Sequence, residues 1–382
     1  MRIGVLTSGG DAPGTNAVIR AVTKSLIHRC GADVLGIEDG YLGLLEHRVR
    51  ALDWRSVSGI VALGGTMLGT TNRVSPLAWQ GRDRCDDVLA YARELGVDGL
   101  VAIGGDGTMA IADALGRHGL PIVGVPKTID NDIAGVARSF GFDTAVARAA
   151  EALDNMQTTG QSLGRVMLVE TMGRYAGWIA LEAGAASGAD VILLPEIEFD
   201  FEAVVAVCRA REAAQRFTVV CVAEGAKPRG GEATVRARVD EAPDPVRLGG
   251  VAQILADHLQ LRLRSEVRAV VLGHVQRGGP PTASDRVLAT RYGSAAADLV
   301  REGAWGSMVT LEHGRIARTE LAKVAGQTRR VPLDHELLRC MRCIGVSLGE
   351  AEEPSRAALT GQPARAAEPF PGVAEERSER VR

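Results

Sequence analysis

The sequence predicts an α/β protein whose sheets are mainly parallel and covered by helices on both faces. Short apolar runs alternate with amphipathic segments of helical length along most of the chain. The apolar runs are unbroken, which is typical of strands buried on both faces of a parallel sheet. A length of 382 residues is sufficient for two domains, or for one large domain divided by a cleft.

The first predicted element is a strand over Arg2–Leu6, which leads into a tight loop over Thr7–Gly14. A helix follows and runs to about His28. We expect Thr15 or Asn16 to cap it, because small polar side chains accept hydrogen bonds from the first free backbone N–H groups of a helix.

Further strands and helices then alternate along the chain. The clearest predicted strands are Leu100–Ile103, Ile122–Val125, Val166–Val169, Val191–Leu194, Thr218–Val222 and Val267–Leu272. The clearest predicted helices are Arg82–Leu95, Thr108–His118, Asp143–Gln157, Phe201–Ala214, Gly250–Leu261 and Asp285–Arg301.

Two segments lack these patterns. Residues 227–246 are rich in Pro, Gly, Arg and Asp, which predicts an exposed loop insertion. Residues 349–382 consist largely of Ala, Glu, Pro, Arg and Ser with almost no apolar periodicity, which predicts a disordered tail.

Composition and charge exclude several classes of protein. A formal net charge of −3 provides no general basic field, so we expect no nucleic-acid partner. No apolar run approaches the ~18 residues of a membrane span, so we expect no membrane partner. The N-terminus enters a strand rather than a signal peptide, which predicts a cytoplasmic protein. Cys340 and Cys343 form a single CxxC pair, a weak indication of a metal or redox site.

The glycine-rich segment Gly104–Thr108 directly follows the predicted strand Leu100–Ile103. Glycine lets the backbone approach phosphate oxygens, and a helix that starts at Thr108 offers free N–H groups at its positive end. Asp106 supplies the hard oxygen ligand that a Mg²⁺–nucleotide requires. The alternative is an ordinary strand-to-helix turn.

The segment Thr128–Asp132 follows the next predicted strand, Ile122–Val125. In open α/β sheets ligands bind outside the carboxyl ends of the strands, so this loop and the glycine-rich loop can face one substrate. One carboxylate can accept a proton from a substrate hydroxyl, while the other orients it or holds Mg²⁺ through water. A solvated Asx-type turn is the alternative. Together the two loops predict a phosphoryl-transfer site.

Three further sites follow apolar runs in the same way. In Glu170–Gly177, Arg174 is suited to neutralise charge on a transferring phosphoryl group. In Gly273–Gly279, His274 and Arg277 can bind one phosphate together. Glu224 is suited to bind a sugar hydroxyl.

Taken together, these residues closely resemble the ATP- and pyrophosphate-dependent 6-phosphofructokinase family. The matching segments fall in order over residues 1 to about 345 and are Leu6–Gly14, Gly40–Gly43, Gly104–Thr108, Pro126–Asp132, Glu170–Gly177 and Glu266–Gly279. The resemblance implies two Rossmann-like three-layer α/β/α domains, with the active site in the cleft between them. A larger donor-binding domain would comprise residues 1–141 and about 276–326. A smaller sugar-phosphate-binding domain would comprise residues 142–275 and about 327–348.

The resemblance implies transfer of the ATP γ-phosphoryl group to the 1-hydroxyl of fructose 6-phosphate, a step of glycolysis, with Mg²⁺ as cofactor. Asp130 corresponds to the catalytic base, supported by Thr128 and Asp132. Arg174 corresponds to the residue that stabilises charge in the transition state. The residues that correspond to the donor site are Gly10, Arg73, Gly105, Asp106, Gly107 and Thr108, with Asp106 as the carboxylate associated with Mg²⁺.

On the acceptor side the corresponding residues are Thr128, Asp130, Met172, Gly173, Arg174, Glu224, His274 and Arg277. Arg165 and Arg268 correspond to arginines that reach the sugar phosphate from a neighbouring subunit, so the resemblance implies a homo-oligomer, either a dimer or a tetramer. Arg73 is assigned to the donor site although the stretch Leu68–Arg73 is one residue longer than the usual spacing of the family.

Two positions bear on the donor. Position 107 is Gly, as in the ATP users of the family, whereas the pyrophosphate users carry Asp there. Position 127 is Lys, as in the pyrophosphate users. We give Gly107 more weight, because an aspartate would repel the nucleotide α-phosphate whereas a lysine need not exclude ATP. A pyrophosphate-dependent phosphotransferase remains the alternative.

Effector regulation is not expected at the pocket that the family uses for it. Arg20 and Lys24 match two of its basic residues, but Trp54 and Gln157 stand where the pattern has arginine.

Two more distant functions are also considered. An NAD or lipid kinase shares the glycine-rich loop, but the Thr128–Asp132 and Gly273–Gly279 loops argue against it. A sugar-phosphate-binding regulator without catalysis would be favoured if Asp130 or Asp106 were replaced, and both are present.

Overall fold

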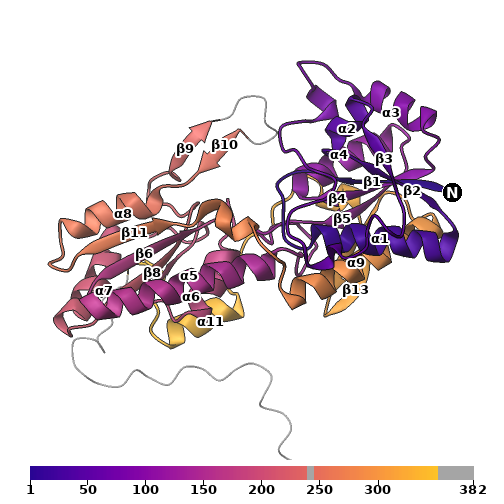
Figure 1. The fold of residues 1–382 in the computed structure, drawn as a ribbon. Coiled ribbons are helices and arrows are strands. Elements are labelled where there is room, and N and C mark those ends of the chain that lie inside the picture. Colours follow the sequence, from indigo (N-terminus) through magenta and orange to yellow (C-terminus); the bar gives the residue numbers. More distant parts are fainter. Residues whose placement is uncertain (239–244, 352–382) are drawn as a thin grey trace, which may run out of the picture. The chain divides into compact units, whose positions relative to one another are not determined.

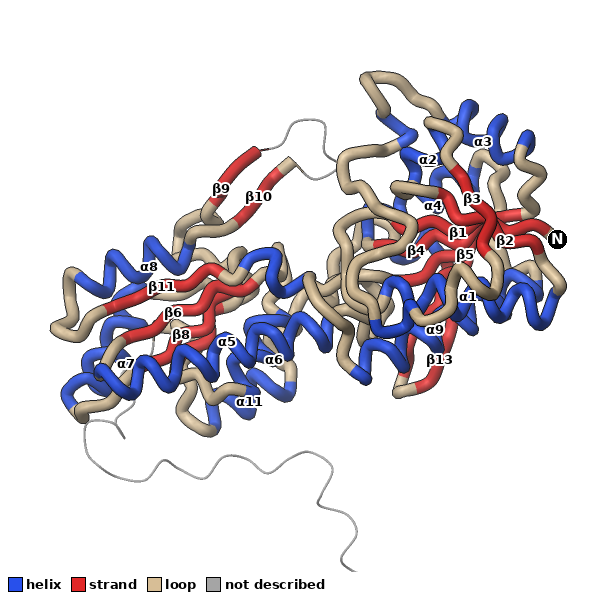
Figure 2. Tube along the Cα trace, in the orientation of Figure 1, coloured by secondary structure: helices blue, strands red, loops and turns tan. Residues whose placement is uncertain are grey.

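The structure is a computed structural model that describes residues 1–238 and 245–351. Its core consists of two separate sheets with helices on both faces, and a short hairpin lies beside one of them (Figures 1 and 2). Among the described residues, no helix has the length and apolarity needed to cross a membrane.

The larger sheet has seven strands in the order β13-β12-β5-β4-β1-β2-β3. The strands are β1 (Arg2–Thr7), β2 (Asp33–Ile37), β3 (Val49–Leu52), β4 (Gly99–Gly104), β5 (Ile122–Pro126), β12 (Ser307–Glu312) and β13 (Arg315–Glu320). Adjacent strands are parallel except at the two edges, where β3 and β13 run antiparallel to their neighbours. Since β1, β4 and β5 are parallel and in register, the loops that follow them emerge at one edge of the sheet.

Helices cover both faces of this sheet. They are α1 (Thr15–Cys30), α2 (Tyr41–Leu45), α3 (Cys85–Glu94), α4 (Asp106–Arg117), α9 (Ala283–Glu302) and α10 (Leu321–Val324), with short 3₁₀ turns η1 (Ile60–Ala62) and η2 (Pro76–Ala78). Side chains of β4 alternate between the faces: Val101 and Ile103 pack with α1 and α9, whereas Leu100 and Ala102 pack with α2, α3 and α4. This alternation explains why the strand is apolar throughout.

The smaller sheet has four strands, all parallel, in the order β11-β6-β8-β7. The strands are β6 (Val166–Thr171), β7 (Val191–Leu193), β8 (Thr218–Ala223) and β11 (Val267–Val271), and the 3₁₀ turn η3 (Gly273–Arg277) follows β11. One face is covered by α5 (Phe142–Leu163), α6 (Trp178–Ala186) and α11 (Glu336–Cys343), and the other by α7 (Phe201–Ala213) and α8 (Val251–Gln260).

The structure confirms the predicted α/β class with mainly parallel sheets. The six strands and six helices predicted most clearly are all present, with ends shifted by a few residues. The predicted helix cap is wrong: α1 is preceded by Gly14, with φ +99°, and has no side-chain cap. Thr15 instead donates to Ala12 O, and Asn16 accepts from Met67 N.

The segment 227–246 is only partly a loop. It contains β9 (Val235–Arg238), which pairs antiparallel with β10 (Val246–Leu248). Residues 239–244, and all of the predicted tail beyond residue 351, lie outside the described residues. Cys340 and Cys343 lie on α11 as free thiols. The predicted boundaries between the two domains stay a prediction.

Candidate active site

Two adjoining cavities lie where the loops at the carboxyl ends of both sheets meet. The larger has a volume of about 720 Å³ and the smaller of about 340 Å³. They share lining residues, namely Gly9, Gly10, Thr71, Asn72, Arg174, Tyr175, Arg247 and Arg277. One ligand, or two ligands in contact, can therefore extend from one cavity into the other.

Most of the residues predicted for the site line one or both cavities. Those at the larger cavity are Gly10, Arg73, Met172, Arg174, Glu224, His274 and Arg277. Those at the smaller cavity are Gly10, Gly105, Asp106, Gly107, Thr108, Lys127, Thr128, Asp130, Asp132, Arg174 and Arg277. Gly173, Arg165 and Arg268 line neither.

The loop after β5 holds its two carboxylates close together in a buried position. Thr128 joins them, because its hydroxyl donates to Asp132 Oδ1 over 3.1 Å and accepts from Asp130 N over 3.0 Å. Burial and the nearby carboxylates of Asp130 and Asp106 raise the pKa of Asp132 to about 7. Asp130 Oδ1 is buried and has no hydrogen-bond partner among the described residues, and Oδ2 lies 4.0 Å from Arg277 Nη2. Asp130 lines the smaller cavity, so its carboxylate can accept a hydrogen bond from a hydroxyl bound there.

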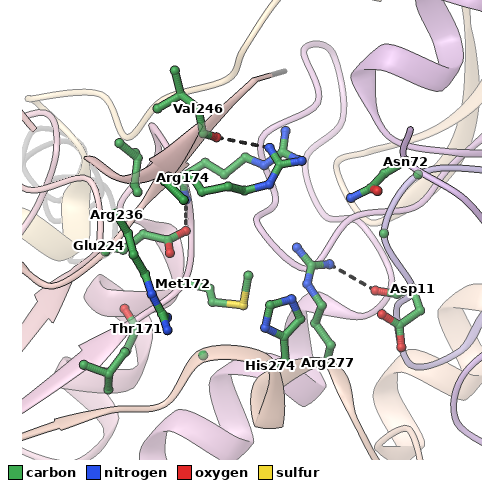
Figure 3. A pocket seen from close by; sticks show the side chains of 18 of the residues that line it. Asp11, Asn72, Thr171, Met172, Arg174, Glu224, Arg236, Val246, His274 and Arg277 are labelled. Carbon is green, nitrogen blue, oxygen red and sulfur yellow. Dashed lines mark hydrogen bonds between the residues drawn. The ribbon is translucent and has the colours of Figure 1, made fainter. Parts of the chain in front are cut away.

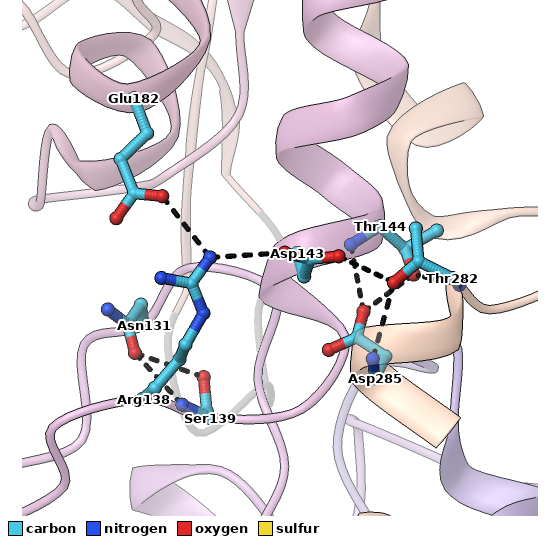
Figure 4. A network of polar contacts seen from close by, with 8 residues as sticks. All are labelled: Asn131, Arg138, Ser139, Asp143, Thr144, Glu182, Thr282 and Asp285. Atoms are coloured by element: carbon cyan, nitrogen blue, oxygen red, sulfur yellow. Dashed lines mark hydrogen bonds and ion pairs between the residues drawn. The ribbon is translucent and has the colours of Figure 1, made fainter. Parts of the chain in front are cut away.

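A network of polar contacts fixes this loop from behind (Figure 4). Asn131 has φ +54°, and its side-chain oxygen accepts from Ser139 N over 3.0 Å. Arg138 pairs with Asp143, on α5, and Glu182, on α6.

The same network joins the two sheets through their helices. The N-termini of α5 and α9 are tied together, since Thr144 donates to Asp285 Oδ2 and Thr282 donates to Asp143 Oδ2. The carboxylate loop is thus attached to helices of both sheets.

The loop after β4 turns directly into α4, which starts at Asp106, two residues earlier than predicted. Gly107 therefore lies in the first helical turn, where backbone N–H groups are free and the helix dipole is positive. A Cβ atom at Gly107 would meet no heavy atom of the described residues within 4 Å, so the part of the chain that the structure describes leaves the space in front of this turn open.

Lys127 lies between this loop and the loop after β1. Its ammonium group donates to Gly10 O, and the residue is buried. Burial, together with the positive charges of Arg277 and Arg174, lowers the pKa of Lys127 to about 7. Arg277 Nη1 donates to Asp11 O over 3.0 Å, so the side chains of Lys127 and Arg277 together hold the Gly10–Asp11 backbone in place.

Glu224, at the end of β8, shapes the turn that carries Arg174. Its Oε1 accepts from Gly173 N over 3.3 Å. It also accepts from Arg174 N over 3.0 Å (Figure 3). Arg174 has φ +51°, a conformation that costs a non-glycine residue about 1 kcal/mol or more. Glu224 offsets this cost. Burial raises the pKa of Glu224 to about 7.

Sequence reasoning missed Gln276, which organises the neighbouring loop. Its fully buried side chain accepts from Met172 N over 3.3 Å and donates to Gly273 O over 3.1 Å. It thereby links the Arg174 loop to the η3 turn that carries His274 and Arg277. The sequence signal available for it was a polar residue at a position between His274 and Arg277, the two predicted phosphate ligands.

Arg165 and Arg268 lie at the amino ends of β6 and β11, opposite the edge that forms the cavities. Both pair with Glu266. In this chain they are therefore remote from the site that the other predicted residues form.

The residues of the family's effector pocket also lie outside both cavities. Lys24 Nζ lies 4.1 Å from the centre of the Trp54 ring, and Gln157 donates to Ser187 O. Lys24 thus contacts a tryptophan at the position where the family pattern has an arginine.

A divalent metal ion would find few protein ligands here. Among the described residues no group of three or more His, Cys, Asp and Glu side chains could hold a metal ion. Asp106 lies at the smaller cavity and supplies one carboxylate. This donor set fits Mg²⁺, which typically binds one or two carboxylates, water and substrate phosphates.

Comparison with known proteins agrees with this geometry. The profile of the family described as Phosphofructokinase matches residues 2–300. The chain is similar to "ATP-dependent 6-phosphofructokinase 2" of Clostridium perfringens, with 45% identity over 91% of this chain and 98% of the relative. It is also similar to "Pyrophosphate--fructose 6-phosphate 1-phosphotransferase" of Amycolatopsis methanolica, with 48% identity over 87% of this chain and 96% of the relative.

A solved structure of phosphofructokinase from Saccharomyces cerevisiae superimposes with a TM-score of 0.73 and 32% identity. The match covers 85% of this chain and 45% of the yeast chain, so this chain spans about half the length of that relative. The family match and the curated relatives confirm the resemblance seen in the motifs: this chain belongs to the phosphofructokinase family.

Proposed function

We propose that the chain is an ATP-dependent 6-phosphofructokinase. It transfers the γ-phosphoryl group of ATP to the 1-hydroxyl of fructose 6-phosphate and yields fructose 1,6-bisphosphate. The observation that carries the choice of donor is the open space in front of Gly107. An α-phosphate can enter that space and meet the free N–H groups of the first turn of α4.

The buried loop after β5 supports a division of labour among its residues. Asp130, with one unpaired oxygen, acts as the base for the 1-hydroxyl. Thr128 and Asp132 position it through the hydrogen bonds described above. Arg174 lines both cavities and so can stabilise charge on the phosphoryl group in transit.

The remaining residues bind the two substrates. Gly10, Gly105, Gly107 and Thr108 surround the donor phosphates, and Asp106 is the carboxylate for Mg²⁺, which neutralises phosphate charge when bound. His274 and Arg277 bind the 6-phosphate, with Met172, Gly173 and Glu224 around the sugar. Arg73 lines only the larger cavity. Its assignment to the donor site is supported by its neighbours in the sequence, Thr71 and Asn72, which line both cavities.

The enzyme acts as a homo-oligomer. Arg165 and Arg268 lie too far along β6 and β11 to reach the cavities of their own chain, and a neighbouring subunit would use them. Subunit exchange between Arg268→Ala and Asp130→Ser proteins should restore part of the activity, because some hybrid sites then contain both intact residues. If labelled subunits exchange without any recovery, the sites are not shared.

Pyrophosphate is the alternative donor, and Lys127 is the residue that favours it. The lysine is already engaged with Gly10 O beneath the donor site. It therefore contributes to the loop structure with either donor, and does not by itself select pyrophosphate.

A steady-state assay with fructose 6-phosphate, Mg²⁺ and either donor tests the proposal. We expect turnover with ATP and little or none with pyrophosphate. Robust turnover with pyrophosphate and none with ATP would show that the alternative is correct.

A further inference from the structure

The hairpin formed by β9 and β10 carries arginines that have no part in the roles above. β9 contains Arg236 and Arg238, and β10 contains Arg247. Every residue of β9 is exposed, and no described residue of either strand belongs to the four clusters of buried apolar side chains. A two-stranded hairpin is marginally stable in water without such packing. Apolar packing therefore does not account for its position.

The base of the hairpin is attached to the floor of the larger cavity. Gly249 N donates to Thr234 O over 3.1 Å and closes the hairpin. The carboxylate of Glu170, at the carboxyl end of β6, then accepts from Gly250 N over 2.8 Å and from Ala252 N over 2.9 Å. Glu170 is buried, so these charge-assisted bonds are poorly screened by solvent. The hairpin thus starts from a fixed point in the site.

The three arginines differ in their relation to the cavities. Arg247 lines both, as Arg174 and Arg277 do. Arg236 lines only the larger cavity, where it extends past Glu224 toward Thr171 (Figure 3). Arg238 lines neither. Only Arg247 therefore lies where a phosphate chain would cross from one cavity to the other.

We propose that the β9–β10 hairpin is part of the active site and that Arg247 binds the phosphate chain of the donor. Its guanidinium can contact two phosphate oxygens at once, at the same cavity that the start of α4 lines. The assignment rests on the proposed function, because it requires the donor phosphates to occupy the smaller cavity.

Arg247→Ala tests the assignment, with Arg238→Ala as the matched control from the same hairpin. We expect Arg247→Ala to raise the KM for the donor about 10-fold or more, the usual scale for a lost charge-assisted contact. Its KM for fructose 6-phosphate should change little. Arg238→Ala should resemble the wild type in both constants. Arg247→Lys keeps the charge but loses the two-pronged contact, so an intermediate rise is expected.

Titration calorimetry with inorganic tripolyphosphate gives a second readout that needs no turnover. Arg247→Ala should bind this probe about 10-fold or more weakly, and Arg238→Ala as the wild type does. Equal donor KM and equal tripolyphosphate affinity in the two alanine variants would overturn the proposal. So would a rise confined to the KM for fructose 6-phosphate. If the probe binds through Arg247 but the wild type does not phosphorylate fructose 6-phosphate, the proposed function fails and the binding site stands.

Discussion

Two groups of charged side chains line the same pair of cavities, and the structure holds them in opposite ways. The carboxylate loop (residues 128–132) is buried and attached from behind to helices of both sheets, with Asp130 only 4% exposed. The cationic group consists of Arg73, Arg174, Arg236, Arg247, His274 and Arg277, which come from loops and a hairpin. Arg73, Arg236 and His274 are exposed, whereas Arg277 is 12% exposed and donates to Asp11 O.

This difference in burial corresponds to two tasks, proton transfer and the binding of phosphate groups. A group that moves a proton must keep its geometry and a low local dielectric, and burial provides both. An exposed cation that attracts a phosphorylated substrate, such as Arg73 or Arg236, can remain solvated until the ligand arrives, because water stabilises its charge. We therefore expect changes in the carboxylate loop to lower kcat, and changes in the cationic group to raise KM, except at Arg174, whose proposed role in the transition state predicts a loss of kcat.

The largest expected effect is that of Asp130→Ser. Loss of a general base lowers kcat by about two to four orders of magnitude, while the KM values should change little. Asp154→Ser, at an exposed position on α5, is the control. A folded Asp130→Ser protein with nearly normal kcat would remove Asp130 from the role of base.

Gly107→Asp should have the next largest effect. The added carboxylate enters open space, so the fold should tolerate it, but it faces the nucleotide phosphates in a poorly screened turn. We expect kcat/KM for ATP to fall by about 100-fold, on the scale of like-charge repulsion. Gly116→Asp introduces the same change at an exposed position on the same helix and should have no such effect. Undiminished use of ATP by Gly107→Asp would show that the α-phosphate lies elsewhere.

Asp132→Asn should stabilise the protein at alkaline pH. The pKa of Asp132 is raised to about 7 by burial and by Asp130 and Asp106, so ionisation opposes folding. The folded state then binds the proton more tightly than the unfolded state, and stability is lost as pH rises from about 4 to about 7. At pH 8 we expect the variant to gain roughly 1–3 kcal/mol in the free energy of unfolding, and at pH 4 almost nothing.

Urea unfolding of the wild type and Asp132→Asn at both pH values measures this gain, with the exposed Asp154→Asn as control. A gain that is the same at pH 4 and pH 8 would contradict the raised pKa.

The smallest expected effect concerns regulation. Lys24 contacts the ring of Trp54 and the pocket lacks two arginines, so phosphoenolpyruvate should inhibit weakly or not at all through it. Strong inhibition that Arg20→Ala abolishes would show that the remaining basic residues suffice.

The carboxylate loop could be predicted from the sequence because local pattern determines it. An apolar run that ends at Thr-Ile-Asp-Asn-Asp places those side chains at the carboxyl edge of a parallel sheet whatever the rest of the chain does. The glycine-rich start of α4 could be predicted for the same reason. Helix capping was predicted less well, since Thr15 and Asn16 bond elsewhere and Gly14 precedes the helix.

The hairpin could not be predicted as readily, because its exposed arginines look like an ordinary solvated loop. Arg247 pairs with Ala237 ten residues earlier, but the segment between the strands is rich in Asp and Pro and resembles a loop, although apolar and arginine residues do alternate in Val235–Arg238. The role of Glu170 could not be predicted either. A carboxylate at the end of an apolar strand does not indicate that it will accept hydrogen bonds from the start of α8.

The most direct test of the difference between the two groups is a binding measurement without the donor. Titration calorimetry of fructose 6-phosphate would compare Asp130→Ser with His274→Ala. Asp130→Ser should bind the sugar phosphate as tightly as the wild type or more tightly, because a negative charge 4.0 Å from Arg277 is gone. His274→Ala should bind it about 10-fold more weakly, on the scale of one lost charge-assisted contact. Weakened binding by Asp130→Ser with unchanged binding by His274→Ala would contradict the account.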